Sequence, residues 1–135
     1  MSAGDGAAVY TQCGLRLRCE FPLDLPIADA DEWDLDVRWG DDIADTTAEP
    51  DGELVVKYSS EEDSWYTATW TGTHYLFRFL HCGQIEITGD LRHVVVRRDP
   101  SGRHTLLPIL VAGTMAAFVM TLRGETVLHA SAVSV

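Results

Sequence analysis

Residues 106–135 read LLPILVAGTMAAFVMTLRGETVLHASAVSV. A long apolar segment of helix length comes first, followed by a short polar hinge and a second apolar run of strand length. Thr105 can cap the first turn, Pro108 falls where a missing N–H costs little, and Gly124 follows at a position that favours left-handed backbone. These signals predict a helix over about 105–123 and a C-terminal strand. Because the helix is apolar nearly all round, we expect it to be buried on most sides.

The apolar segment Leu106–Leu122 has 17 residues, the lower limit for a helix that crosses a bilayer. It contains proline, glycine and two threonines, and it has no aromatic belt and no basic cluster on one flank of the kind that marks a membrane boundary. We therefore expect the buried helix of a soluble domain and no membrane partner.

Length and composition indicate one folded domain. The chain has 135 residues, of which 46% are hydrophobic, an ordinary share for a globular protein. Residues 1–8 are small and polar and predict a disordered tail, which leaves residues 9–135 as a single domain. The first residues show no signal peptide. Three cysteines without CxxC spacing, Cys13, Cys19 and Cys82, predict reduced thiols in a cytoplasmic protein.

The net charge of −11 is unevenly distributed along the chain. Residues 1–64 carry 17 of the 21 acidic residues and 4 of the 10 basic ones, whereas residues 65–135 carry all five histidines. Such a charge repels phosphates and argues against a nucleic-acid partner. The acidic half is either a solvated surface, which we favour, or a surface for a basic protein.

Short segments of strand character between residues 9 and 97 predict about seven strands. The strongest signal is a hairpin in which aromatic and β-branched residues flank Thr71–Gly72. The alternation from Trp33 to Trp39 predicts a strand with one wet face. Two prolines in Phe21–Pro26 exclude regular structure, so this segment predicts an extended apolar clip lying on the domain. The predicted strands cover residues 9–18, 33–39, 54–58, 65–70, 73–79, 84–88 and 91–97.

Together with the long buried helix and the C-terminal strand, these strands predict an α+β fold. Because the strongest strand pairings are hairpins, we expect a mostly antiparallel sheet that the helix covers.

Three clusters could carry chemistry, and each has a simpler interpretation. The acidic segment Asp29–Asp36 lacks the glycine and distal glutamate of a calcium loop, so solvated carboxylates are expected. His81 and Cys82 would point to opposite faces of a strand, and zinc would need ligands from elsewhere. His129 and Ser131 share a face of the terminal strand, but a hydrolytic pair also needs an orienting acid. We predict no catalytic residue, cofactor or metal in this chain.

Residues 122–133, LRGETVLHASAV, resemble the segment that precedes the phosphate loop in HPr serine kinase-like proteins. In that family a helix, an Arg-Gly turn and an LHASAV strand lead into a second strand and a GxSGxGKS loop. Residues 14–17 and 20–23 resemble the opening of the family, and the hairpins between are similar in order. The resemblance implies an ATP-dependent serine kinase or phosphorylase that binds ATP and magnesium, with His129 close to the nucleotide.

The chain departs from the family because it contains no GxxxxGK[ST] sequence and stops before the phosphate loop. We therefore expect the N-terminal part of a larger ATP-binding protein, non-catalytic by itself. ATP and magnesium would bind only in full-length relatives. The missing ATPase half, or another protein, would cover an apolar C-terminal face that otherwise self-associates. The alternative is a stand-alone protein-binding or regulatory module without ATPase activity.

Overall fold

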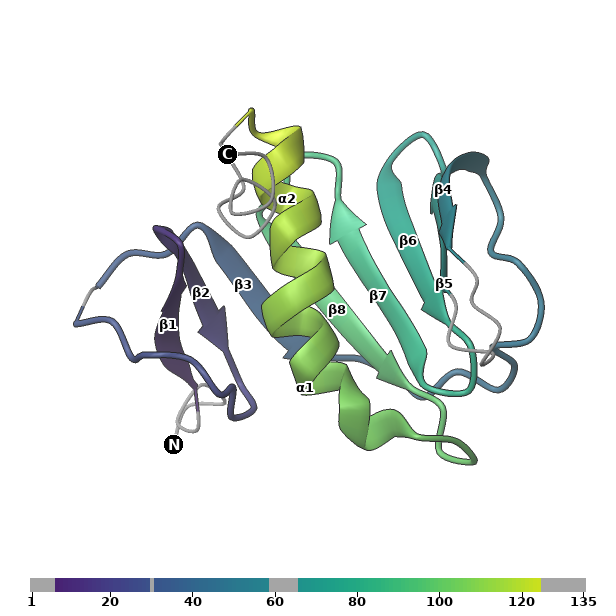
Figure 1. Ribbon diagram of the computed structural model, residues 1–135, viewed down its shortest axis with the longest axis horizontal. Helices are drawn as coiled ribbons and strands as arrows, with labels where there is room; N and C mark the ends of the chain where they lie inside the picture. Colours follow the sequence, from purple (N-terminus) through teal and green to yellow (C-terminus); the bar gives the residue numbers. More distant parts are fainter. Residues whose placement is uncertain (1–6, 30, 59–65, 125–135) are drawn as a thin grey trace, which may run out of the picture. The chain divides into compact units, whose positions relative to one another are not determined.

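The computed structural model describes residues 7–29, 31–58 and 66–124, and Figure 1 shows its elements. The chain divides into two compact units, Met1–Asp36 with Pro108–Val135 and Val37–Leu107. The single domain predicted for residues 9–135 includes residues outside the described ranges and stays a prediction.

The first unit begins with a tight hairpin of β1 (Ala8–Gln12) and β2 (Leu15–Cys19), which pair antiparallel. The turn residues Cys13 and Gly14 have φ angles of 53° and 88°. Positive φ at both central residues is the turn geometry that matches the twist of paired strands. The prediction of one strand over residues 9–18 was wrong, because Gly14 was not recognised as the second residue of this turn.

The predicted apolar clip is confirmed, and its continuation pairs with β1. The Thr11 N–H donates to the Pro26 carbonyl over 2.9 Å, and the Ala28 N–H donates to the Val9 carbonyl over 2.8 Å. Phe21 is buried at 5% exposure. The clip therefore supplies apolar core, and its backbone covers an edge of the hairpin that would otherwise be open.

The second unit contains five consecutive antiparallel strands. They are β4 (Glu53–Tyr58), β5 (Tyr66–Trp70), β6 (His74–Phe79), β7 (Gly83–Thr88) and β8 (His93–Arg98). The hairpin predicted around Thr71–Gly72 is confirmed, since Trp70 pairs with Tyr75 and Tyr66 with Phe79. One face of these strands is apolar and buried, with Ala68, Phe77, Phe79, Ile85, Ile87, Val94 and Val96.

The sheet contains one more strand, β3 (Leu35–Trp39), and the hydrogen-bonded order is β1-β2-β3-β8-β7-β6-β5-β4. Directly after β3, the Gly40 N–H donates to the Val96 carbonyl and the Ile43 N–H donates to the Arg98 carbonyl, each over 2.9 Å. These bonds advance in the same direction along both segments, as in parallel pairing. The prediction of a mostly antiparallel sheet of about seven strands was therefore wrong. The described residues form a mostly sheet protein, with eight strands in one mixed sheet and one helical run.

A single helical run covers His104–Leu122, 19 residues. It consists of a 3₁₀ turn (His104–Leu106), α1 (Leu107–Leu110), a π segment (Val111–Met115) and α2 (Ala116–Leu122). Its predicted end is confirmed by Gly124, which has a φ of 78°. The predicted N-cap at Thr105 was wrong, because the run begins one residue earlier.

The predicted burial of the helix on most sides is met only in part: one stripe is buried, most other residues between 107 and 120 are half-buried, and Ile109 and Gly113 are exposed. Ile109 is 66% exposed. Apolar residues all round the helix therefore do not imply burial all round it. The buried residues are Leu107, Val111, Met115, Ala116, Val119 and Met120.

By length and hydropathy the helix could cross a membrane, but core helices of soluble proteins meet the same criteria. The absence of a membrane partner therefore stays a prediction. The predicted C-terminal strand lies outside the described residues.

Candidate functional site

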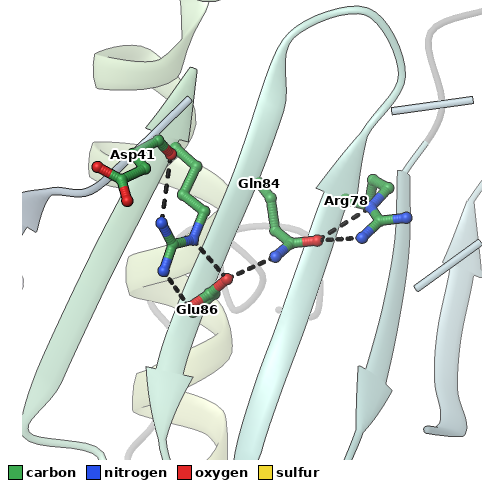
Figure 2. Close-up of polar contacts among 5 residues, drawn as sticks. Asp41, Arg78, Gln84 and Glu86 are labelled. Carbon is green, nitrogen blue, oxygen red and sulfur yellow. Dashed lines mark hydrogen bonds and ion pairs between the residues drawn. The ribbon is translucent and has the colours of Figure 1, made fainter. Parts of the chain in front are cut away.

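Four polar or hollow features stand out among the described residues, and the first lies on the polar face of β6, β7 and β8. Arg97 on β8 donates from Nε to Glu86 Oε2 over 2.8 Å, and Gln84 donates to the same oxygen over 2.6 Å (Figure 2). Arg78 on β6 donates from Nε to Gln84 Oε1 over 2.9 Å. The two arginines, Gln84 and Glu86 thus form one hydrogen-bonded network across the three strands. The hydrogen bond to Glu86 raises the pKa of Arg97.

The acidic loop that follows β3 bonds to the same two arginines. Arg78 also donates to the Ala48 carbonyl over 3.1 Å, and Arg97 donates to the Asp41 carbonyl over 3.3 Å. The Thr69 hydroxyl donates to the Asp51 carbonyl over 2.6 Å. Carbonyl groups of an irregular loop have no regular backbone partners, and here the two guanidinium groups bond to them. This explains why the face of the sheet beside the loop is polar. This arrangement therefore has a structural role and holds the loop against the sheet.

The second feature contains the residue types of a catalytic triad, Asp99, Ser101 and His81, but not the geometry of one. Asp99 is buried and accepts from the Ser101 hydroxyl over 2.7 Å and from the Thr46 hydroxyl over 2.8 Å. These hydrogen bonds, Ser101 first, hold the pKa of Asp99 below its usual value. A hydrolytic triad places a histidine between the acid and the serine. Here the serine donates directly to the acid, so the cluster anchors the turn after β8.

The third feature is the acidic segment Asp29–Asp36, for which solvated carboxylates were predicted. That prediction was wrong for Asp34, which directly precedes β3, and for Asp36 within β3. Asp34 Oδ2 accepts from the Arg16 N–H over 2.9 Å, and Asp34 Oδ1 lies 3.7 Å from Arg123 Nη2. Asp36 is 8% exposed and accepts from Arg18 Nη1 over 2.9 Å. The alternation along the sequence predicts the direction in which each aspartate points. It does not predict the arginine partners, because these come from segments that are distant in sequence.

The fourth feature is hollow and lies within the first unit. Two open hollows of about 340 and 440 Å³ share the residues Gln12 and Gly113. A side chain at Gly113 would meet nothing within 4 Å. We call these two hollows the Gly113 groove. Its other lining residues are Cys13, Thr114, Ala117 and Met120 in the smaller hollow and Pro22, Asp24, Leu25, Pro108, Ile109 and Ala112 in the larger.

The chemistry of the Gly113 groove is mostly apolar. Asp24 and Cys13 are ionisable, and no lysine or arginine is among its described lining residues. The Gln12 side-chain amide donates to the Ala112 carbonyl over 2.8 Å, within the π segment of the helix. π segments inside α-helices frequently occur at functional sites. The groove therefore suits an apolar ligand better than a phosphate.

The structure describes only some of the residues singled out from sequence, and it does not gather these into one site. His81 is exposed and Cys82 is buried, but both lie in the turn between β6 and β7, so the orientation expected for strand residues does not apply to them. In the part of the chain that the structure describes, no three His, Cys, Asp or Glu residues form a metal-binding group. His129 and Ser131 lie outside the described residues, so the approach of His129 to a nucleotide stays a prediction.

Gln12 and Thr46 carry structural roles that were not predicted. Nothing in the sequence around either residue distinguishes it from an ordinary polar residue. The π segment did leave a signal, since Leu107, Val111, Met115 and Val119 recur every four residues, which is longer than an α-helical turn.

Comparisons with protein-family models, curated proteins and solved structures gave no match. The resemblance of residues 122–133 to HPr serine kinase-like proteins therefore stays a prediction from sequence.

Proposed function

We propose that this chain is the N-terminal part of a protein like the HPr serine kinases and is non-catalytic by itself. The observation that carries the proposal is the turn at Arg123–Gly124. The helix ends at Leu122 and Gly124 has a left-handed φ of 78° shortly before the LHASAV sequence. A helix and an Arg-Gly turn are what the resemblance requires at this place.

The chemistry of the Gly113 groove supports a non-catalytic role. Nucleoside triphosphates are held by backbone N–H groups, a lysine and magnesium in proteins with a phosphate loop. The groove offers an aspartate and apolar side chains instead, and the sequence contains no phosphate-loop motif. We therefore propose that ATP and magnesium are bound only by residues that full-length relatives add.

The proposal is tested by titrating the chain with magnesium ATP in a calorimeter and by reading the coding sequence after codon 135. We expect no heat of binding at millimolar ATP, and a reading frame that continues into a GxSGxGKS loop. A stop codon at this position would contradict the proposal. ATP binding by the isolated chain would contradict its non-catalytic part.

A second candidate is a stand-alone protein-binding or regulatory module, and exposed apolar residues on β4 favour it. Leu54, Val55 and Val56 are 57%, 43% and 37% exposed, and β4 is the last strand in the order of the sheet. Exposed edge strands tend to pair with other chains. Light scattering across a concentration series tests this candidate, with Val55→Lys as the variant that should abolish any self-association.

Location and excluded partners follow from the same composition. We propose a cytoplasmic protein, because its three cysteines are free. We propose no nucleic-acid or membrane partner, because a charge of −11 repels phosphates and anionic lipids alike.

A further inference from the structure

The spacing of the buried helix residues conflicts with regular α-helix geometry. Leu107, Val111, Met115 and Val119 are each 0% exposed and follow one another at intervals of four. An α-helix has 3.6 residues per turn, so this spacing drifts by about 40° at each step. Over the three steps the drift is about 120°, enough to carry the last residue off the buried stripe.

The π segment removes most of this drift. A π turn closes its hydrogen bond over five residues instead of four, so it takes up one additional residue, about 100° of rotation. The N–H of Ala116 donates to the carbonyls of Val111 and Gly113, which shows the widened turn. Because of it, Val119 stays on the stripe of Leu107, and Arg123 lies 3.7 Å from Asp34.

Gln12 supplies a donor at the widened turn. Its amide is 2.8 Å from the Ala112 carbonyl, within the π segment. Pairing of Gln12 with Leu15 next to the tight turn fixes the backbone that carries this amide. Gly113, the residue after Ala112, adds no side chain to the groove beside this bond.

We propose that Gln12 sets the rotational register of the helix. With the Gln12 amide bound to the Ala112 carbonyl, residues 111–115 hold the π turn. Without that donor, the segment returns to α-helical spacing and residues 116–123 rotate by about 100°, one residue of an α-helix. Val119 then leaves the buried stripe and Arg123 leaves Asp34. The helix of the first unit thus has two possible rotational registers, and the hydrogen bond from Gln12 in the β1–β2 hairpin selects between them.

The first experiment compares Gln12→Met with Gln12→Lys. Methionine keeps the length of the side chain without a donor, whereas lysine keeps a donor. We expect Gln12→Met to change the backbone chemical shifts of residues 111–123, and Gln12→Lys to leave them near those of the parent chain. The opposite result would show a packing role and overturn the proposal. So would the absence of a scalar coupling across the Gln12–Ala112 hydrogen bond in the parent chain, a measurement that needs no variant.

The second experiment tests the link to Arg123 by a double-mutant cycle. Gln12 and Arg123 bond to different partners, so independent effects should add. We expect Arg123→Gln to lower the thermal midpoint of the parent chain and to have no effect when Gln12 is already methionine, because the contact with Asp34 is already lost. Additive shifts in the midpoint would overturn the proposed device.

Discussion

The hydroxyl of Thr46 donates to Asp99 Oδ2 over 2.8 Å in a buried contact between residues 53 positions apart. The same hydroxyl oxygen accepts from the His81 N–H over 2.9 Å. A single side chain in the acidic loop thus holds the turn after β8 and the turn before β7. Removing a buried hydroxyl of this kind lowers stability mainly because its donor and acceptor partners are then left without hydrogen bonds.

Replacing Thr46 by valine should therefore destabilise the protein. The shape is kept, but the His81 N–H and one oxygen of Asp99 lose a partner, which costs about 1–3 kcal/mol for each group that water cannot reach. Thr67 gives a matched control, because it is also fully buried and its hydroxyl has no partner among the described residues. Thr67→Val should be neutral or slightly stabilising. Urea unfolding of both variants measures the difference, and equal free energies of unfolding would contradict the assigned role of Thr46.

Asp99 should make stability depend on pH in the acid range. Hydrogen bonds from Ser101 and Thr46 hold its pKa below the usual value. A carboxyl with a lowered folded-state pKa stabilises the protein above its unfolded-state pKa, about 3.9, and this stabilisation is lost as the pH falls through the folded-state pKa. Asp99→Asn should be less stable than the parent chain at pH 7, and the difference should shrink below about pH 4. Unfolding midpoints measured from pH 7 to about pH 3 test this, and a difference that is constant with pH would refute it.

The elements of the fold were more predictable than their partners. The alternation of Leu15 and Leu17 with Arg16 and Arg18 and the hairpin at Thr71–Gly72 come from local periodicity, and the structure has both. The parallel course of residues 40–43 beside β8 depends on a partner that is distant in sequence, which no local pattern encodes. The same holds for Asp34, whose partner Arg123 is far along the chain.

Two glycines should respond in opposite ways to alanine. A Cβ at Gly102 would lie 2.0 Å from the His81 carbonyl oxygen, a backbone atom that cannot move away cheaply. A Cβ at Gly113 would meet nothing within 4 Å. Gly102→Ala should lower the free energy of unfolding by more than about 2 kcal/mol. Gly113→Ala should raise it by about 0.5–1 kcal/mol, because alanine loses less backbone entropy in a helix. Chemical denaturation of both variants checks the signs, and the same sign for both would contradict the close approach of Gly102 to His81.

The ion pair of Glu86 and Arg97 on the polar face of the sheet should contribute more to stability than the exposed pair of Glu49 and Lys57. Glu86 and Arg97 have side chains 20% and 29% exposed, and Gln84 also depends on Glu86. Glu86→Ala should destabilise by about 1–3 kcal/mol, since two donors lose their acceptor. The control is Glu49→Ala, which breaks the pair with Lys57 where both side chains are about half exposed. That variant should change stability by less than about 1 kcal/mol. Thermal unfolding of the two variants in low and high salt compares their stabilities. An equal loss of stability in Glu86→Ala and Glu49→Ala would be inconsistent with the network in Figure 2.

The candidate site was less predictable than the fold. Apolar composition and the spacing of Leu107, Val111, Met115 and Val119 are visible in the sequence, but the Gly113 groove also needs Gln12 and Leu25 from the other end of the chain. Local patterns place residues on faces, whereas a groove between distant segments requires the tertiary fold.

The three thiols should differ sharply in their reaction with iodoacetamide. Cys13 is exposed in the turn between β1 and β2, whereas Cys19 and Cys82 are buried. Burial raises the pKa of Cys19 to about 12 and also raises the pKa of Cys82. The thiolate is the reactive form, so both buried groups should be inert in the folded protein at about pH 8. Mass spectrometry should find one alkylated cysteine in the native chain, none in the Cys13→Ser control, and all three after denaturation. Native alkylation of Cys19 at the rate of Cys13 would show that the Cys19 side chain is not buried as described.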